Sequence, residues 1–158
     1  MNIVVAISDA KVSSRAEDVI MTYSLGSCIA VALFDPLVKV AGMLHFQLPS
    51  STADAARAAE RPLMYGDTGM LWLLEKMSQR GAERRRLQVH LAGGANMLND
   101  HGLFDIGRRN HASIRKILWH NKMLINAEHV GGASPRNIQI NVVDGSVVIK
   151  HNNEYIAI

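Results

Sequence analysis

The chain has 158 residues, of which 48% are hydrophobic and 20% are charged, and its formal net charge is +3. This length and apolar content suffice for one compact domain, which we expect to span residues 1–158. Low-complexity segments and long apolar stretches are absent from the sequence, which argues against a largely disordered protein and against membrane insertion. Aromatic residues make up only 5% of the chain and do not interleave with the basic runs, which argues against a platform for single-stranded nucleic acid.

The amino-terminal stretch and the cysteine content bear on the compartment. The first ten residues, MNIVVAISDA, lack the charged start and the long apolar core of a secretory signal. Cys28 is the single cysteine, so no internal disulfide can form. A lone thiol in a chain without an export signal fits a reducing compartment. We therefore expect a cytoplasmic protein whose one thiol is free to react.

Strand-forming patterns fill the first third of the chain. Apolar and β-branched residues favour four strands, expected at 2–7, 19–23, 29–34 and 38–46. Asp35 and Pro36 form a turn signal between the last two strands. These two strands are therefore expected to pair as a hairpin.

Helical patterns dominate the middle of the chain. An alanine-rich stretch at 52–60 predicts a short helix that Pro62 ends. Asp67 or Thr68 is expected to cap a second helix that runs through Gln79. The buried face of this second helix is expected at Met70, Leu71, Leu74 and Met77.

The remaining segments predict one more helix and four strands. The helix is expected at 106–121, with Ile114, Ile117 and Leu118 on one face. Asp144-Gly145 suits a two-residue primed turn between the last two strands. The strands are expected at 87–91, 124–130, 137–143 and 146–151. Strands outnumber helices without regular alternation, which predicts an α+β or layered α/β fold dominated by antiparallel pairing.

Glycine pairs and histidines suggest phosphate or metal sites, but neither group completes a motif. Gly93-Gly94 and Gly131-Gly132 lack the lysine and the further glycine that phosphate-binding loops require, and tight turns explain them better. No two histidines are four residues apart, so we expect neither a metal nor a cofactor. The seven histidines stand at positions 45, 90, 101, 111, 120, 129 and 151.

Basic residues cluster in two runs, Arg84 to Arg86 and Arg108-Arg109. Such runs are typical of solvated helix faces, and the alternative is a surface for an acidic partner. No nucleic-acid recognition motif accompanies them, so nucleic acid is the weakest of the candidate partners.

One pair of residues could perform chemistry. Cys28 opens an apolar strand after Leu25-Gly26-Ser27, and His45 lies near the end of the next strand, so the expected hairpin makes them neighbours. An imidazolium lowers the pKa of a nearby thiol, and the same ring can later protonate a departing amine. Gly26 is expected to allow a tight turn that aims the Cys28 amide at an oxyanion. A buried free cysteine beside a hydrogen-bonded core histidine is the alternative.

The segments around this pair resemble a known family, the chemoreceptor glutamine deamidases called CheD. The resemblance is carried by TYSLGSCIAVALFDP at 22–36 and AGMLHFQLP at 41–49. It continues through YGDTGM, LAGGANM, IGRRN and HVGG, and so covers almost the full chain. By this resemblance Cys28 is the catalytic nucleophile, His45 is the general base and acid, and Thr22 orients the imidazole.

The resemblance also implies a fold, a reaction and partners. The fold would have stacked β-sheets with helices outside them, similar to the catalytic domains of glutamine-deamidating toxins. The reaction would convert receptor glutamine side chains to glutamate through a cysteine thioester, with release of ammonia, and some family members hydrolyse glutamyl methyl esters. The implied partners are the cytoplasmic helices of methyl-accepting chemoreceptors and a CheC-type response-regulator phosphatase.

Two positions depart from the family pattern, and one alternative function stays open. His129 stands where many members have an acidic residue, and Pro135 stands where they have a small one. Both lie outside the catalytic turn, so they bear on partner contacts or substrate preference. The alternative is a non-catalytic chemotaxis adaptor that binds receptors or the phosphatase, although an adaptor has no physical need for a thiol-imidazole pair.

Overall fold

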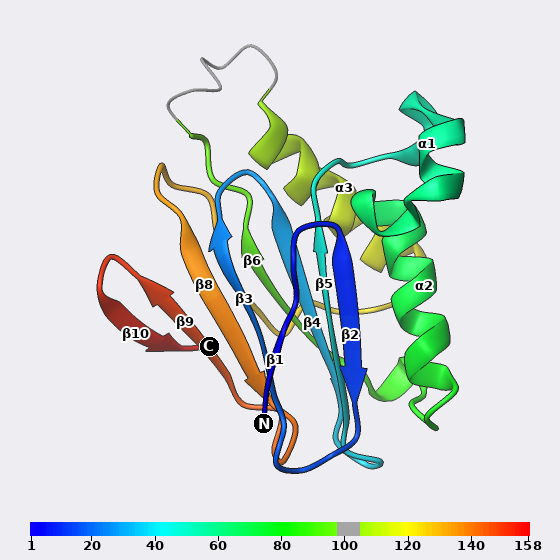
Figure 1. The fold of residues 1–158 in the computed structure, drawn as a ribbon, viewed down its shortest axis with the longest axis vertical. Coiled ribbons are helices and arrows are strands. Elements are labelled where there is room, and N and C mark those ends of the chain that lie inside the picture. The colour runs from blue at the N-terminus through cyan, green and yellow to red at the C-terminus, as the bar shows by residue number, and fades with distance from the viewer. Residues whose placement is uncertain (98–104) are drawn as a thin grey trace.

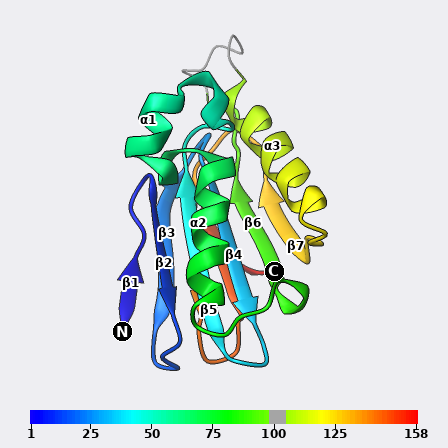
Figure 2. The same ribbon diagram turned by 90° about the vertical axis from the view of Figure 1, so that its right-hand side faces the viewer.

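The computed structural model describes residues 1–97 and 105–158. In these ranges the chain forms three layers, with two stacked five-stranded sheets and three α-helices outside one of them (Figures 1 and 2). This architecture confirms the expected layered fold with mainly antiparallel sheets. His101, one of the seven histidines in the sequence, lies outside the described residues.

Sheet A has the strand order β1-β3-β8-β9-β10. Its pairs are antiparallel except for the parallel pair of β1 with β3. Its strands are β1 (Asn2–Val4), β3 (Val19–Leu25), β8 (Arg136–Asn141), β9 (Val147–His151) and β10 (Glu154–Ala157).

Sheet B has the strand order β2-β5-β4-β6-β7. Here β6 and β7 are parallel and the other pairs are antiparallel. Its strands are β2 (Asp9–Ser13), β4 (Ile29–Asp35), β5 (Val40–Phe46), β6 (Gln88–Gly93) and β7 (Ala127–Val130).

The helices lie on the side of sheet B that faces away from sheet A (Figure 2). They are α1 (Ala55–Glu60), α2 (Gly66–Ser78) and α3 (Ile106–His120). Short 3-10 segments occur at Ser51–Ala53, Pro62–Met64 and Arg84–Arg86. None of the described helices lies on the outer face of sheet A (Figure 1).

Strand β4 is buried along its whole length because it lies between two cores. Ala30, Ala32 and Phe34 face the core between the sheets. Ile29, Val31 and Leu33 belong to the core under the helices. A strand that is covered on both faces reads as a continuous apolar run, which is why this segment stands out in the sequence.

The β4–β5 hairpin is confirmed, and its register runs from Ile29 opposite Phe46 to Asp35 opposite Val40. The first expected strand is shorter than predicted, since β1 ends at Val4. Two strands, β2 and β10, were not expected. Both are short edge strands with exposed polar residues, so they lack the apolar pattern that marks the central strands.

The expected start of α2 was wrong. The helix follows Tyr65 without a side-chain cap, and Asp67 instead accepts hydrogen bonds from the backbone and hydroxyl of Ser51 at 3.0 and 2.6 Å. The expected buried face was also wrong at one position, because Leu71 is 65% exposed while Leu73 is fully buried. Asp67 therefore does not cap the helix, because its carboxylate makes a tertiary contact with Ser51 in the preceding segment.

The expected turn at Asp144-Gly145 was also wrong, although the hairpin itself is confirmed. Strands β8 and β9 pair only as far as Ile140 opposite Val147, and Gly145 alone has a positive φ, of 74°. The two-residue primed turn lies one hairpin later, at Asn152 and Asn153, whose φ values are 51° and 64°. Two adjacent asparagines tolerate this left-handed backbone, so the sequence did carry its signal.

Candidate functional site

Cys28 lies in the short turn where the chain passes from sheet A to sheet B. Strand β3 ends at Leu25 in sheet A, and β4 begins at Ile29 in sheet B. The register of β3 shifts between Thr22 and Leu25, and Ser24 there has a φ of 56°. Such bulges redirect a strand and are common beside active sites. The chain thus changes direction at the bulge, and the half-buried Cys28 follows in the turn between the two sheets.

Backbone hydrogen bonds from the segment after β6 fix this turn in place. The Gly94 amide donates to the Cys28 carbonyl at 2.8 Å, and the Ala95 amide donates to the Gly26 carbonyl at 2.8 Å. Gly93 has a φ of 109°, and a Cβ there would overlap the Cys28 carbonyl oxygen. Glycine is therefore required at Gly93 by its backbone conformation and by this close approach.

The chain bends at Gly26, and the structure shows a packing reason for glycine there. Gly26 is absent from the positive-φ residues, so a left-handed turn is not what requires glycine there. A Cβ at this position would instead lie 3.3 Å from the Met97 side chain. The glycine allows close packing beside the turn that carries Cys28, and Met97 is a flexible neighbour that can move.

Thr22 and His45 come from different sheets and meet in the core between them. Thr22 Oγ1 lies 2.8 Å from His45 Nδ1, and both residues are 1% exposed. The Thr22 hydroxyl donates its single proton to the Val5 carbonyl at 2.6 Å. Its oxygen must therefore accept from Nδ1–H. The neutral imidazole then keeps the lone pair of a proton acceptor on Nε2.

Cys28 and His45 occupy neighbouring positions on one face of sheet B. His45 is opposite Ala30, so Cys28, two residues before Ala30, is its diagonal neighbour. Cys28 packs against the core between the sheets, which His45 also faces. His45 Nε2 is buried and makes no hydrogen bond within residues 1–97 and 105–158. Extending the register by one residue beyond Ile29 thus puts Cys28 diagonal to His45, and His45 Nε2 makes no hydrogen bond to the thiol.

Burial sets the protonation state of the pair. Desolvation lowers the pKa of His45 to about 4, against a smaller opposing effect of the Asp9 carboxylate. Desolvation also raises the pKa of the Cys28 thiol, while its own backbone amide acts in the opposite direction. Both shifts favour a neutral thiol beside a neutral imidazole at pH 7. The expectation of a resting thiolate stabilised by an imidazolium is therefore not supported.

Asn110 is a polar residue at the site whose role the sequence did not reveal. Its side chain is fully buried, and Nδ2 donates to the carbonyls of Ser27 and Gln47 at 2.9 Å each. It shares the buried face of α3 with Gly107, Ile114 and Leu118. An amide at helical spacing on an apolar face was the available signal, since buried polar groups need partners.

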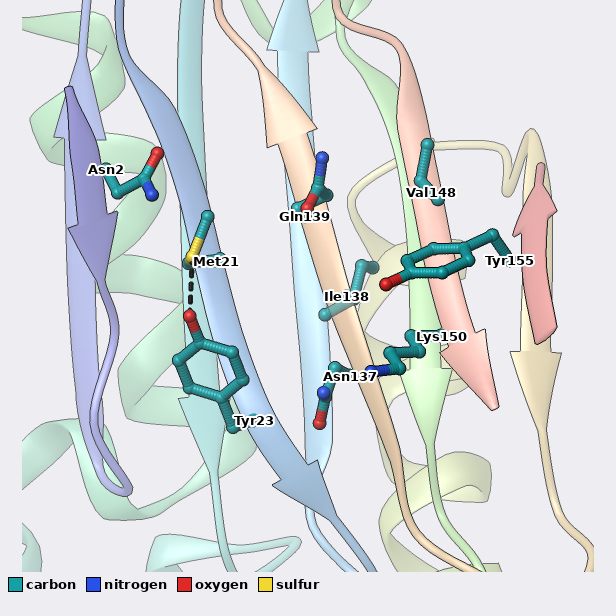
Figure 3. A pocket seen from close by; sticks show the side chains of 9 residues that line it. All are labelled: Asn2, Met21, Tyr23, Asn137, Ile138, Gln139, Val148, Lys150 and Tyr155. Atoms are coloured by element: carbon teal, nitrogen blue, oxygen red, sulfur yellow. Dashed lines mark hydrogen bonds between the residues drawn. The ribbon is translucent and has the colours of Figure 1, made fainter. Parts of the chain in front are cut away.

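A shallow hollow of about 240 Å³ lies on the outer face of sheet A, where the Tyr23 hydroxyl donates to Met21 Sδ (Figure 3). It is lined by Asn2, Met21, Tyr23, Asn137, Ile138, Gln139, Val148, Lys150 and Tyr155. The described residues contain no group of three or more potential metal ligands, and no described helix could span a membrane.

Comparisons with known proteins connect this geometry to one family. Residues 47–151 match the family model of CheD, described as chemotactic sensory transduction. A protein of Solibacter usitatus named probable chemoreceptor glutamine deamidase CheD is 43% identical over 96% of this chain and 90% of its own length. Similarly named proteins of Syntrophus aciditrophicus and Anaeromyxobacter dehalogenans are 42% and 40% identical over 94% and 96% of this chain, and over 93% and 96% of their own lengths. The chain belongs to the CheD family.

Proposed function

We propose that this chain is a chemoreceptor glutamine deamidase that uses Cys28 as nucleophile, His45 as general base and acid, and Thr22 as the residue that orients His45. The names of the relatives support the substrate and the reaction. The observation that carries the residue roles is the Thr22–His45 hydrogen bond, because it leaves the Nε2 lone pair buried on the face that Cys28 shares.

Attack on the substrate begins from the neutral pair. The Cys28 sulfur forms a bond to the carbon of the glutamine carboxamide while Nε2 of His45 takes the thiol proton. Catalytic hydrogen bonds are often long in unliganded enzymes and shorten in the complex, which accommodates the absent thiol–imidazole bond. The Cys28 amide belongs to the nucleophilic residue itself and would therefore be within reach of the oxyanion that forms on the carbon bonded to its sulfur.

Breakdown of this intermediate releases ammonia. The carbon–nitrogen bond breaks as protonated Nε2 donates its proton to the leaving nitrogen, and a thioester remains on Cys28. Water then attacks the thioester carbon as Nε2 takes one proton of the water. The carbon–sulfur bond breaks, and Nε2 returns that proton to the departing sulfur. The products are a glutamate side chain and the restored thiol. A glutamyl methyl ester would follow the same path with methanol as the leaving group.

The proposed receptor partner follows from this reaction, and the proposed phosphatase partner follows from the family resemblance. The substrate would be the cytoplasmic helices of methyl-accepting chemoreceptors, which places the proposed site of action in the cytoplasm. A CheC-type phosphatase would bind near the mouth of the site and restrain the activity. His129 and Pro135 would affect such contacts rather than the chemistry, since neither carries a role in the steps above.

Mass spectrometry of a receptor cytoplasmic fragment incubated with the protein tests the proposal. Conversion of glutamine to glutamate is expected with the wild-type chain and is expected to vanish in Cys28→Ala. The alanine variant should keep its circular dichroism and melting temperature, because the loss of one sulfur from a half-buried position creates only a small cavity. Receptor binding without conversion would instead favour the non-catalytic adaptor.

A further inference from the structure

Asn110 joins two chain segments that would otherwise separate at the site. The two hydrogens of its Nδ2 reach the carbonyls of Ser27 and Gln47. Ser27 directly precedes Cys28, and Gln47 lies two residues after His45. One buried amide therefore contacts both segments that carry the reacting side chains.

The β-ladder between these segments ends where the Asn110 contacts begin. The last pair of β4 and β5 at this end is Ile29 with Phe46. Beyond it Gln47 turns away from β4, and its amide donates to the Met64 carbonyl at 2.9 Å. The Cys28 carbonyl likewise bonds to the Gly94 amide of another segment. Asn110 thus replaces the ladder as the link between the two diverging ends.

The helix that carries Asn110 is itself fixed against the catalytic turn. A Cβ at Gly107 would overlap the Ala95 carbonyl oxygen and lie 2.7 Å from Gly94. Gly94 in turn bonds to Cys28. The first turns of α3 therefore touch the same short segment that holds the nucleophile, so Asn110 projects from a rigid support.

The two polar atoms of the Asn110 side chain differ in their partners. Oδ1 is buried and makes no hydrogen bond within the described part of the chain. Nδ2 makes both of the side chain's hydrogen bonds. The useful part of this side chain is the pair of donors aimed at Ser27 and Gln47.

From these contacts we infer that Asn110 is a positioning residue that sets Cys28 at the distance from His45 needed for proton transfer from thiol to imidazole. The inference rests on the proposed function, because the transfer it serves is the first step of deamidation. Misplacement of reacting groups by about 1 Å can cost about 100-fold in rate. Loss of Asn110 should therefore act on chemistry rather than on substrate affinity.

The rate of deamidation by Asn110→Ala as a function of pH tests this role. At pH 7 we expect kcat to fall about 100-fold with KM nearly unchanged. The deficit should shrink toward pH 9, because a thiolate formed by hydroxide no longer needs His45 to take its proton. A merely structural defect would lower the rate by the same factor at every pH, and this result or a raised KM with normal kcat would overturn the inference.

Ser113→Ala is the matched control. Ser113 lies on the same helix, and its hydroxyl donates to the Pro49 carbonyl at 2.9 Å, so it also ties α3 to the segment after β5. It does not contact Ser27. We expect its pH profile to match that of the wild-type chain. If Asn110→Ala does not fold, Asn110→Asp replaces that variant in every assay. The aspartate keeps the side-chain volume but lacks both amide donors.

Alkylation of Cys28 separates this inference from the proposed function. Cys28 is the only cysteine, so the mass of the whole protein after iodoacetamide treatment reports on it alone. We expect faster alkylation in Asn110→Ala than in the wild-type chain or Ser113→Ala, because the opened junction exposes a thiol whose pKa burial raises. Faster alkylation without any receptor deamidation by the wild-type chain would overturn the proposed function and the positioning role with it. Wild-type deamidation together with unchanged alkylation in the variant would overturn the positioning role alone.

Discussion

At the scale of single residues, the site is defined by where protons reside before substrate arrives. The Thr22 hydroxyl is committed to the Val5 carbonyl, so the tautomer of His45 follows from hydrogen-bond counting. Burial then keeps both His45 and Cys28 neutral at pH 7. In the proposed mechanism the thiolate is therefore produced during the reaction, by proton transfer from Cys28 to Nε2 of His45, and is not present beforehand.

This protonation state predicts a slow resting thiol. Iodoacetamide is expected to alkylate wild-type Cys28 at pH 7 more slowly than it alkylates a free thiol with an ordinary pKa of about 8.5, and the rate should rise with pH. The deamidation rate, in contrast, should hold to about pH 5, because His45 stays neutral above its pKa of about 4. Rapid alkylation at pH 7, with a pH-independent rate, would show that a thiolate is already present.

His45 should also make the stability of the fold dependent on pH. Its pKa is about 4 in the folded chain against an ordinary 6.5, so folding favours the neutral ring. The stabilisation present above pH 6.5 is lost as the pH falls toward 4. Urea denaturation measures the free energy of unfolding at pH 7 and at pH 4. Between these two pH values it should fall by about 3 kcal/mol more in the wild-type chain than in His45→Asn. The exposed His120→Asn is the control and should behave like wild type.

Thr22 offers a test of the tautomer. Thr22→Val keeps the shape but removes the acceptor of Nδ1–H, so kcat should fall roughly 100-fold. The unpaired buried N–H should also cost about 1–3 kcal/mol of stability. Thr22→Ser keeps the hydroxyl and should retain most of the activity. Steady-state kinetics of the three proteins decide the matter, and equal rates for the valine and serine variants would exclude an orienting role.

At the scale of elements, the fold separates the two arginine runs that the sequence left equivalent. Arg86 forms a salt bridge with the buried Asp35 at 2.9 Å, at the end of β4 opposite to Cys28. Seven residues of strand place that end about 20 Å from the thiol. Arg108 and Arg109 are exposed on the first turn of α3, which packs beside Gly94 and the catalytic turn.

This placement predicts that only the α3 arginines assist docking of an acidic substrate. Reversal of charge at Arg108 and Arg109 should raise KM for receptor fragments about tenfold and reduce the salt dependence of binding. The same reversal at Arg84 and Arg85 should leave both unchanged. Binding of the two double variants across a range of ionic strength provides the comparison. Identical salt dependence in all proteins would mean that both runs are solvated surface.

The elements also show what the sequence could and could not predict. The β4–β5 hairpin was predictable because β4 is apolar on both faces and Asp35-Pro36 marks its turn. That register alone brings Cys28 near His45. The sequence did not predict the edge strands β2 and β10, because short, half-exposed strands carry little apolar pattern. The sequence did not predict the start of α2 correctly, because Asp67 accepts a hydrogen bond from Ser51. That contact depends on the path of the intervening chain.

At the scale of the whole molecule, the division into two sheets was not predictable from local pattern. Strands β3 and β4 are consecutive, but they belong to different sheets, and nothing in the turn between them signals the crossing. The Thr22–His45 hydrogen bond depends on that crossing, as does the contact of Asn110 with Ser27 and Gln47. The resemblance to CheD suggested the proposed role of Thr22, and the path of the chain accounts for its hydrogen bond to His45.

The pairing of Thr22 from sheet A with His45 from sheet B makes turnover sensitive to how the sandwich is held together. If the two sheets slide or part slightly while each keeps its own ladder, the imidazole loses its support although the strand content is unchanged. In a urea titration, deamidase activity should therefore decline at lower denaturant than the far-ultraviolet circular dichroism signal. The loss of activity would then reveal a loosening of the interface between the sheets that far-ultraviolet circular dichroism does not detect.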